Sequence, residues 1–426
     1  MFWKKKPKVE APKVAPKEEP RRADPPRQEA RREEPRREAA PAAPAPASGD
    51  QKARLAAALA GVPPASPDIA AAQARAIDSL LGEPALRGVV QDLLDGRAGR
   101  AFDALERDAD ATASPDKWNR AGILMFAADR ARAGRMLEKA FAAGPPNFWG
   151  GILLARLRGS AGDFKSALEA AGGALMAAQT PAERGVAHAE SATIAMVQGQ
   201  ASLAMQHANS AVEISRADIK AGARDPFTMR DLVARLVMLG DACVAGSVVA
   251  GASGAYVSAL EGARTLASVD PKNPELARGV AEILEKAASA FSSAQDHASA
   301  GRHVAEAVSI RRRLAEGGRD AAAVVALAGA LNTSGEVQRQ AGDLQGAKAS
   351  FDEAMSIARQ AVARDPSDVG AKREVWSVMW RLATMGAAGV SWRDVLAAME
   401  GMANNGGLNS RDWPFYEEAK RRAAAS

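Results

Sequence analysis

A trio of residues in a small–large–small pattern recurs along this chain at nearly fixed intervals. In the trio Ala347, Phe351 and Ala354, the spacings of four and three residues place all three on one face of a helix. Successive trios lie 34, 37, 48, 48, 47 and 48 residues apart, and the other six are Ala133/Leu137/Ala140, Ala167/Ala171/Ala174, Ala204/Ala208/Ala211, Ala252/Tyr256/Ala259, Ala300/Val304/Ala307 and Val395/Met399/Met402. Such periodicity predicts an array of equivalent units and argues against a single globular core.

A second helix-like pattern precedes each of the four C-terminal trios. It carries a small residue at Gly240, Ala288, Gly335 and Ala383, and four residues earlier a large one at Leu236, Leu284, Leu331 and Met379. Units are separated by Asp-Pro pairs or by Gly317-Gly318, where a helix cannot continue. Because alternating β-branched and aromatic residues are nearly absent, we expect an all-α chain of helical hairpins.

These residues resemble the tetratricopeptide repeat. Trp118 and Gly122, followed by Ala133, Leu137, Ala140 and Pro145, match its pattern with one residue deleted, and Gly335, Gly342, Ala347, Phe351 and Ala354 match it without deletion. The 47–48-residue units are similar to the lengthened bacterial form. This chain departs from the tetratricopeptide pattern at four positions. Gln338 and Cys243 stand where the pattern has an aromatic residue, and Ala288 and Ala383 stand where it has glycine. The resemblance covers about residues 113–403. It implies a right-handed superhelical solenoid of about seven hairpins that binds proteins or peptides and has no catalytic residues.

Five segments follow from these patterns. We expect residues 1–50 to form a disordered, charged Pro/Ala-rich arm and residues 51–112 to form N-terminal helices, as a cap or degenerate repeat. Residues 113–222 are expected to form shorter repeats, residues 223–403 long repeats, and residues 404–426 a C-terminal capping segment. The arm contains few apolar residues and many prolines, so it cannot bury enough surface to fold by itself.

The arm also carries the whole net charge of +5, because residues 1–48 hold 13 basic and 8 acidic side chains and the remainder is balanced. Its arginines alternate with glutamates and no aromatic residues interleave them, so we expect no nucleic-acid binding. Phe2, Trp3, Lys4, Lys5 and Lys6 form a weak candidate for contact with an anionic membrane. The favoured interpretation of the arm is a soluble tether.

We expect a cytoplasmic protein. No apolar signal segment follows Met1, and the single cysteine, Cys243, fits a reducing compartment. The longest uncharged run, Ala242–Leu260, is rich in glycine and serine, and the repeat register places a turn in its middle. We therefore interpret it as two packed helix ends and not as a membrane span.

Nothing in the sequence has the pattern of a catalytic, metal or cofactor site. The four histidines (His188, His207, His297 and His303) lack the spacing of a zinc-binding helix and are interpreted as surface or turn residues. Cys243 has apolar neighbours and is interpreted as a small core residue. No phosphate-binding loop and no nucleophile elbow occurs. We therefore expect neither enzymatic activity, nor a cofactor, nor a small-molecule substrate.

The polar positions of the first helices are the best candidates for function, since in the tetratricopeptide family these helices line the concave face. The candidates are Asp241, Glu282, Glu285, Ser289, Asn332, Glu336, Arg339, Gln340, Trp380 and Thr384. Their acidic lean suggests a peptide or helix with some basic charge, although an ordinary solvated helix face would look the same.

The resulting hypothesis is a non-catalytic protein-interaction scaffold or adaptor. Two alternatives stay open: a regulatory or sensor subunit of an enzyme system, and a peripheral membrane assembly factor tethered by the arm. Three tryptophans near the end of the array, Trp376, Trp380 and Trp392, are expected to seal it as a cap, and an exposed aromatic patch is the alternative.

Overall fold

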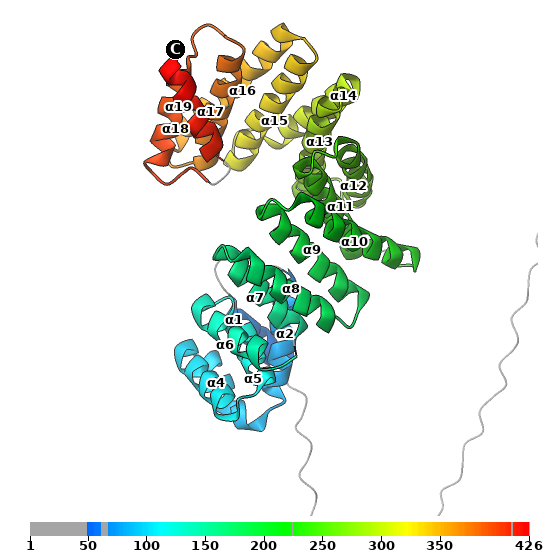
Figure 1. Ribbon diagram of the computed structural model, residues 1–426, viewed down its shortest axis with the longest axis vertical. Helices are drawn as coiled ribbons and strands as arrows, with labels where there is room; N and C mark the ends of the chain where they lie inside the picture. Colours follow the sequence, from blue (N-terminus) through cyan, green and yellow to red (C-terminus); the bar gives the residue numbers. More distant parts are fainter. Residues whose placement is uncertain (1–48, 61–66, 146, 224, 410–411, 426) are drawn as a thin grey trace, which may run out of the picture. The chain divides into compact units, whose positions relative to one another are not determined.

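The computed structural model describes residues 49–60, 67–145, 147–223, 225–409 and 412–425, and in these residues the chain is an all-α solenoid (Figure 1). No β-strand occurs in the described part. The helices are α1 (Gly49–Leu59), α2 (Pro67–Leu81), η1 (Pro84–Leu86), α3 (Arg87–Leu94), α4 (Ala98–Thr112), α5 (Pro115–Met125), α6 (Arg130–Ala143), α7 (Phe148–Ser160), α8 (Phe164–Ala177), α9 (Pro181–Val197), α10 (Ala201–Lys220), α11 (Pro226–Ala245), α12 (Val249–Val269), α13 (Pro274–Ser293), α14 (His297–Leu314), α15 (Ala321–Gln340), α16 (Leu344–Arg364), α17 (Val369–Thr384), α18 (Trp392–Ala403) and α19 (Trp413–Ala425).

Seven consecutive hairpins, from α5/α6 to α17/α18, form the array, which confirms the predicted hairpins. Each helix packs on the next one along the chain. First helices also contact the first helix of the next hairpin, as in α7 with α9, α13 with α15 and α15 with α17. Successive second helices make no contacts of this extent within the described residues. The first helices therefore lie on the inner side of the array.

Short polar side chains begin most of these helices. Asp225, Asn273, Asp320 and Asp368 each accept a hydrogen bond from the backbone in the first turn of a long first helix. Asp225-Pro226 lies between hairpins α9/α10 and α11/α12, where a unit boundary was predicted. It opens α11, with the carboxylate as cap and the proline in the first turn, where its missing N–H costs no hydrogen bond. Gly342, at a φ of 86°, supplies the left-handed residue between α15 and α16.

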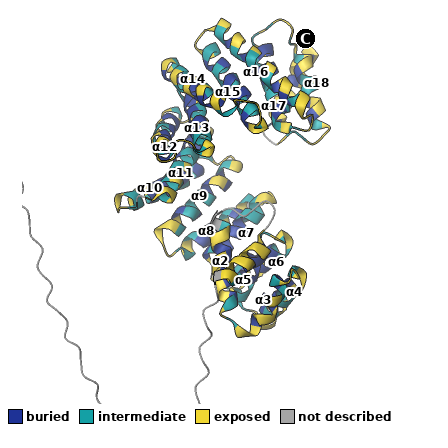
Figure 2. Cartoon of the chain, turned by 180° about the vertical axis from the view of Figure 1, so that it is seen from behind, coloured by how far each residue is buried: buried dark blue, intermediate teal, exposed yellow. Residues whose placement is uncertain are grey.

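The recurring trios form the core between the two helices of every hairpin. All 21 of these side chains are at most 3% exposed, and the buried residues lie on the facing sides of the helices (Figure 2). Burying a large apolar side chain contributes about 1.5–3 kcal/mol. Because every unit buries its own trio, stability is distributed along the array and not concentrated in one centre.

The small residue of the first helix sets how closely the two helices approach. A Cβ on Gly335 would lie 2.5 Å from Cε1 of Phe351, and one on Gly122 would lie 2.6 Å from Cγ of Leu137. At Gly240 a Cβ would overlap the ring of Tyr256. The two units with alanine in this position have Val304 or Met399 as the facing large residue. Among the four long repeats, alanine thus replaces glycine where the opposing side chain is not aromatic.

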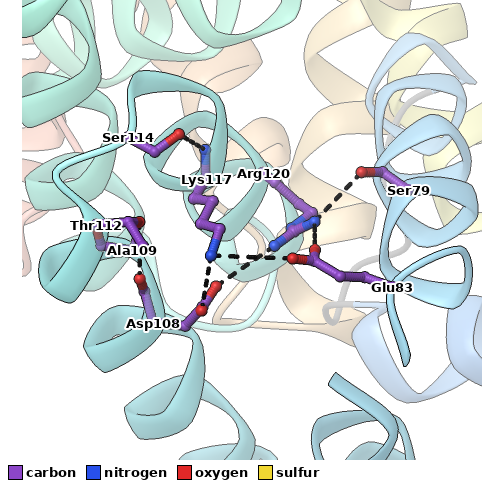
Figure 3. Close-up of polar contacts among 8 residues, drawn as sticks. All are labelled: Ser79, Glu83, Asp108, Ala109, Thr112, Ser114, Lys117 and Arg120. Atoms are coloured by element: carbon purple, nitrogen blue, oxygen red, sulfur yellow. Dashed lines mark hydrogen bonds and ion pairs between the residues drawn. The ribbon is translucent and has the colours of Figure 1, made fainter. Parts of the chain in front are cut away.

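Helices α1–α4 pack at the N-terminal end of the array. A charged cluster joins them to α5, the first helix of the array: Lys117 Nζ lies 2.8 Å from Asp108 Oδ1, and Arg120 is ion-paired with Glu83 (Figure 3). Arg120 Nη2 also lies 3.6 Å from Asp108. The cluster connects the turn after α2, the last part of α4 and the start of α5. Helix α1 begins within the predicted arm, whose residues 1–48 lie outside the described part of the chain.

Helix α2 also reaches across the inner side of the short repeats. It contacts α5, and its Arg75 Nη1 lies 3.0 Å from Glu183 Oε1 of α9. The Arg75 guanidinium carbon is 6.0 Å from the ring centre of Trp149 on α7. The inner face of the short repeats is therefore covered from within the chain.

An aromatic cluster closes the C-terminal end. The ring centres of Trp380 and Trp392 are 4.9 Å apart, those of Trp380 and Phe415 are 5.2 Å apart, and Trp376 is 6% exposed. These rings come from α17, α18 and α19. Phe415 remains 45% exposed, so α19 covers the end of the array only in part.

Candidate partner-binding groove

A hollow on the inner side lies between α11 and α13. It has a volume of about 610 Å³. The residues that line it are Asp241, Val244, Ser247, Val249, Ala252, Tyr256, Glu285, Lys286, Ser289, Ala290, Ser293 and Thr333. Its α11 end is apolar: Val244 is 56% exposed there, beside the buried ring of Tyr256.

A second hollow, of about 280 Å³, continues the first towards α15 and α17. Its lining is polar and consists of Ser289, Ser292, Ser293, Asn332, Thr333, Glu336, Val337, Gln340 and Arg381. Both hollows share Ser289, Ser293 and Thr333. We call the two together the inner groove.

Six of the ten residues proposed from sequence line the inner groove: Asp241, Glu285, Ser289, Asn332, Glu336 and Gln340. The other four lie elsewhere. Glu282 lines a separate hollow at the opposite ends of α13 and α15, Arg339 binds Glu336 outside the lining, and Trp380 belongs to the C-terminal aromatic cluster. Thr384, at the end of α17, donates a hydrogen bond to its own helix at the Trp380 carbonyl.

Asp241 is already engaged by two donors. Its Oδ1 accepts a hydrogen bond from the Tyr256 hydroxyl at 2.6 Å and another from Lys286 Nζ at 2.8 Å. Burial, together with this hydrogen bond, raises the pKa of Tyr256, so its hydroxyl keeps its proton and acts as a donor. Asp241 thus ties the core of one hairpin to the first helix of the next.

The other two acidic residues of the groove are also paired. Arg311 Nε lies 2.8 Å from Glu285 Oε1, yet burial of this carboxyl group dominates and raises its pKa. Burial acts in the same direction on Glu336, but hydrogen bonds from Arg339 and Gln340 outweigh it and lower the pKa of Glu336. Arg381 Nη1 adds an ion pair at 3.3 Å. The acidic lean seen in the sequence is therefore largely neutralised inside the fold.

Sequence reasoning missed several lining residues. Tyr256 was assigned to the core alone, although its hydroxyl reaches the groove. Lys286 and Ser293 lie three residues before and four residues after Ser289 on α13, so helical periodicity from one proposed residue would have found both. Val244, four residues after Gly240, could have been found in the same way.

Two of the four histidines, His188 and His207, differ from their interpretation as surface or turn residues, whereas His297 directly follows the turn between α13 and α14. His188 of α9 and His207 of α10 are partly buried, with their Nδ1 atoms 2.9 Å apart. At this distance one ring must be the donor and the other the acceptor. His303 stacks on Phe291 with ring centres 5.2 Å apart. Cys243 is 6% exposed, and burial raises the pKa of its thiol.

Among the described residues, no group of three or more potential ligands is arranged to hold a metal ion. None of the helices in the described segments is both long and apolar enough to cross a membrane. The uncharged run Ala242–Leu260 is divided between α11 and α12, with the turn in its middle as predicted. Residues 2–6, the proposed membrane contact, lie outside the described part of the chain.

No protein-family model matches the chain, and no curated protein matches it. Several solved structures do. BtubC (BKLC) from P. vanneervenii is 24% identical over 61% of this chain and 92% of that one, with a TM-score of 0.42. The apo form of RapI is 14% identical over 84% and 99% of the two chains, with a TM-score of 0.48. The C-terminal part of a TPR repeat-containing protein from Cytophaga hutchinsonii is 13% identical over 68% and 99%, with a TM-score of 0.41.

At these identities the likeness concerns the fold alone. The repeat character of this chain rests on its own packing, namely seven hairpins, buried trios and the close approach of glycine to a large ring or side chain. The described part of the chain is a solenoid of tetratricopeptide-like helical hairpins.

Proposed function

We propose that the inner groove binds a segment of a protein partner and that the chain is a non-catalytic interaction scaffold. The observation that carries this proposal is the continuity of the two hollows along α11, α13, α15 and α17, which share three lining residues. Concave sites that combine an apolar part with a few placed polar groups are the usual form of binding sites in proteins.

The two ends of the inner groove suit different parts of a partner. Val244, Val249 and the ring of Tyr256 offer an apolar recess, where burial of one aliphatic or aromatic side chain contributes about 1.5–3 kcal/mol. The hydroxyl and amide groups around Ser289, Asn332 and Gln340 offer hydrogen bonds. Because the carboxylates already have basic partners, the inner groove has little attraction for a basic segment.

Two substitutions test the proposal without disturbing the core. Ser289 is exposed and Val244 is 56% exposed, so Ser289→Arg fills the groove and Val244→Asp makes its recess polar. Charge reversal at Glu285 or Glu336 is a poorer test, because it would leave Arg311 or Arg339 without its partner. Ser210→Arg, on second helix α10, is the matched control.

The measurement is affinity purification of the full chain from its native host, followed by mass spectrometry. We expect a defined set of proteins to be retained by the wild type and by Ser210→Arg, and to be lost with Ser289→Arg and with Val244→Asp. Identical sets for all four proteins would refute groove binding. Circular dichroism of each variant verifies that the helices are intact.

A further inference from the structure

A separate hollow lies between α2 and the N-terminal parts of α5, α7 and α9 (Figure 1). It has a volume of about 390 Å³ and shares no lining residue with the inner groove. Sites for small molecules in proteins have volumes of roughly 300–1,000 Å³. We call this hollow the α2 pocket, because α2 forms one of its walls with Ala72, Arg75, Ala76 and Ser79.

The α2 pocket contains a buried amide group without a partner. Asn119 of α5 lines the pocket and is 6% exposed, and its side chain makes no hydrogen bond within the described part of the chain. Gly150 of α7 approaches it so closely that a Cβ there would lie 2.0 Å from Asn119 Oδ1. Buried polar side chains are nearly always hydrogen-bonded, since an unmet donor or acceptor costs free energy. The Asn119 amide therefore offers a ligand two N–H donors and a carbonyl acceptor.

The other walls of the α2 pocket are mainly apolar and partly aromatic. Phe148 and Trp149, at the start of α7, meet edge to face with ring centres 4.9 Å apart. Ala76 and Ile123 are 5% and 7% exposed. Nε1 of Trp149 is buried without a hydrogen-bond partner. A planar ring suits such walls, because aromatic rings pack favourably in offset or edge-to-face contacts.

The charged residues that line the α2 pocket are paired or exposed to solvent. Arg75 Nη1 lies 3.0 Å from Glu183 Oε1, and two backbone N–H groups before α9 also donate to Glu183. Arg120 is ion-paired with Glu83 (Figure 3), and Asp116 is exposed. A charged ligand would lose its hydration here without gaining an unpaired partner, so these charges favour a neutral one.

We propose that the α2 pocket binds a small, neutral, planar molecule with an amide edge, as aromatic amides and uracil-like bases have. The N–H of the ligand donates to Asn119 Oδ1, its carbonyl accepts from Asn119 Nδ2, and its ring packs on Trp149. Asparagine pairs in this two-bond manner with the edge of adenine in protein–DNA complexes. Such a molecule is a ligand and not a substrate, and its site is independent of the inner groove.

The test uses the full-length chain with benzamide and uracil as probes. Each has an analogue of similar shape without the amide N–H, namely acetophenone and dimethyluracil, and benzoate adds a negative charge. Binding is detected by saturation-transfer NMR, and dissociation constants are measured by titration. Asn119→Asp keeps the size of the side chain and removes its donor, whereas Ala76→Leu fills the α2 pocket from α2. Asn209→Asp, at an exposed position of α10, is the matched control.

We expect benzamide or uracil to bind, and the tighter of the two identifies the class of the ligand. Its analogue without the N–H, and benzoate, should bind about tenfold more weakly. Asn119→Asp should weaken binding of the probe about tenfold. Ala76→Leu should abolish it, and Asn209→Asp should leave it unchanged. Circular dichroism verifies that each variant is folded.

Three results would overturn the proposal: neither probe binds, the analogues without the N–H bind as tightly as the probes, or both pocket variants keep the wild-type affinity. None of these results bears on the retention of protein partners by the inner groove, so the two sites are tested separately.

Discussion

The short repeats (113–222) and the long repeats (223–403) follow one plan with different side chains. In the short repeats, α8 and α10 present Ala171 and Ala208 as the central residue of the trio, whereas α12 and α16 present Tyr256 and Phe351. A Cβ on Gly151 of α7 would lie 2.9 Å from the Cβ of Ala174, so two small residues meet there. Two of the four long repeats meet through glycine against an aromatic ring, at Gly240 on Tyr256 and Gly335 on Phe351.

The inner faces of the two regions also differ. In the short repeats, α2 crosses that face and leaves a hollow of about 390 Å³ whose lining includes Ala76, Asn119 and Trp149. In the long repeats the equivalent face is open as the inner groove. The comparison teaches that one helical surface can serve the protein's own stability in one region and be available for a partner in another.

The largest expected difference concerns the central residue of the trio. Phe351→Ala empties a fully buried site and is expected to cost about 3–5 kcal/mol of unfolding free energy. Ala171→Gly in the short repeats removes one methyl group and is expected to cost about 1 kcal/mol. Hydrogen exchange followed by mass spectrometry reports both losses locally. Equal losses of unfolding free energy would show that the central residue of the trio stabilises the hairpins of both regions to the same extent.

The next largest expected effect on stability concerns Arg235, at the junction of the short and the long repeats. Arg235 of α11 is 4% exposed, and its Nη1 donates to the Ala211 carbonyl at 3.1 Å and to Ser215 Oγ at 2.7 Å. A Cβ on Gly185 of α9 would overlap its guanidinium group.

Arg235→Ala leaves a cavity and removes a partner from three groups, the Ala211 carbonyl, the Ser215 hydroxyl and the Asp231 carboxylate, so we expect a loss of about 3 kcal/mol. The measurement is urea unfolding monitored by circular dichroism. Arg230→Ala, at an exposed position of the same helix, should change stability by less than about 0.5 kcal/mol. A similar small change for both variants would contradict a role of Arg235 in joining the regions.

Acid should weaken the short repeats more than the long ones. Burial lowers the pKa of both His188 and His207, and the other histidine, Arg184 and Arg235 lower that of His188 further. As the pH falls, the unfolded chain binds protons at these histidines before the folded chain does. The stability that the uncharged pair gives to the folded state is therefore fully present above a pH of about 6.5, and it is lost as the pH falls towards the lowered pKa values of the two histidines.

The measurement compares hydrogen exchange in α9 and α10 at pH 7.5 and pH 5.5 with that in α15 and α16. We expect faster exchange at the lower pH, after correction for intrinsic rates, only in the first pair. His207→Gln should remove most of the difference. An unchanged acid response in this variant would assign the effect to other groups.

The smallest effect concerns the cover of the short repeats. Arg75 is mostly exposed, so Arg75→Ala should cost less than about 1 kcal/mol although it breaks the ion pair with Glu183. It should still increase the access of acrylamide to Trp149, measured as fluorescence quenching against the exposed control Arg54→Ala. Unchanged quenching would mean that α2 shields this ring without help from Arg75.

The sequence predicted the parts of the fold that depend on residues close together in the chain. Periodicity identified the trios, and all of them are buried because a helix fixes which residues share a face. The same logic identified Ser289 and Glu336 as groove residues. It could not predict that Lys286 pairs with Asp241, 45 residues away, since this contact depends on how successive hairpins are rotated.

The remaining discrepancies have the same physical origin. Trp380 and Thr384 lie on a first helix, as the groove residues do, but the rings of α18 and α19 surround Trp380 and the lined hollow ends at Arg381. The histidine pair needs two side chains from different helices to meet with particular rotamers. Position within a repeat is therefore predictable from sequence, whereas the neighbours across repeats are not.

Because the long repeats recur at a nearly constant interval, one repeat length can be removed from the chain without changing the register of the remaining helices. Removing residues 249–296, a block of 48 residues, would join the end of α11 to the start of α14 in the register that α11 and α12 now have, because Ala300, Val304 and Ala307 replace Ala252, Tyr256 and Ala259. Gly240 would then face the smaller Val304. Such a shortened protein should remain folded while lacking the serines of α13, so architecture and recognition can be separated by a single in-frame excision.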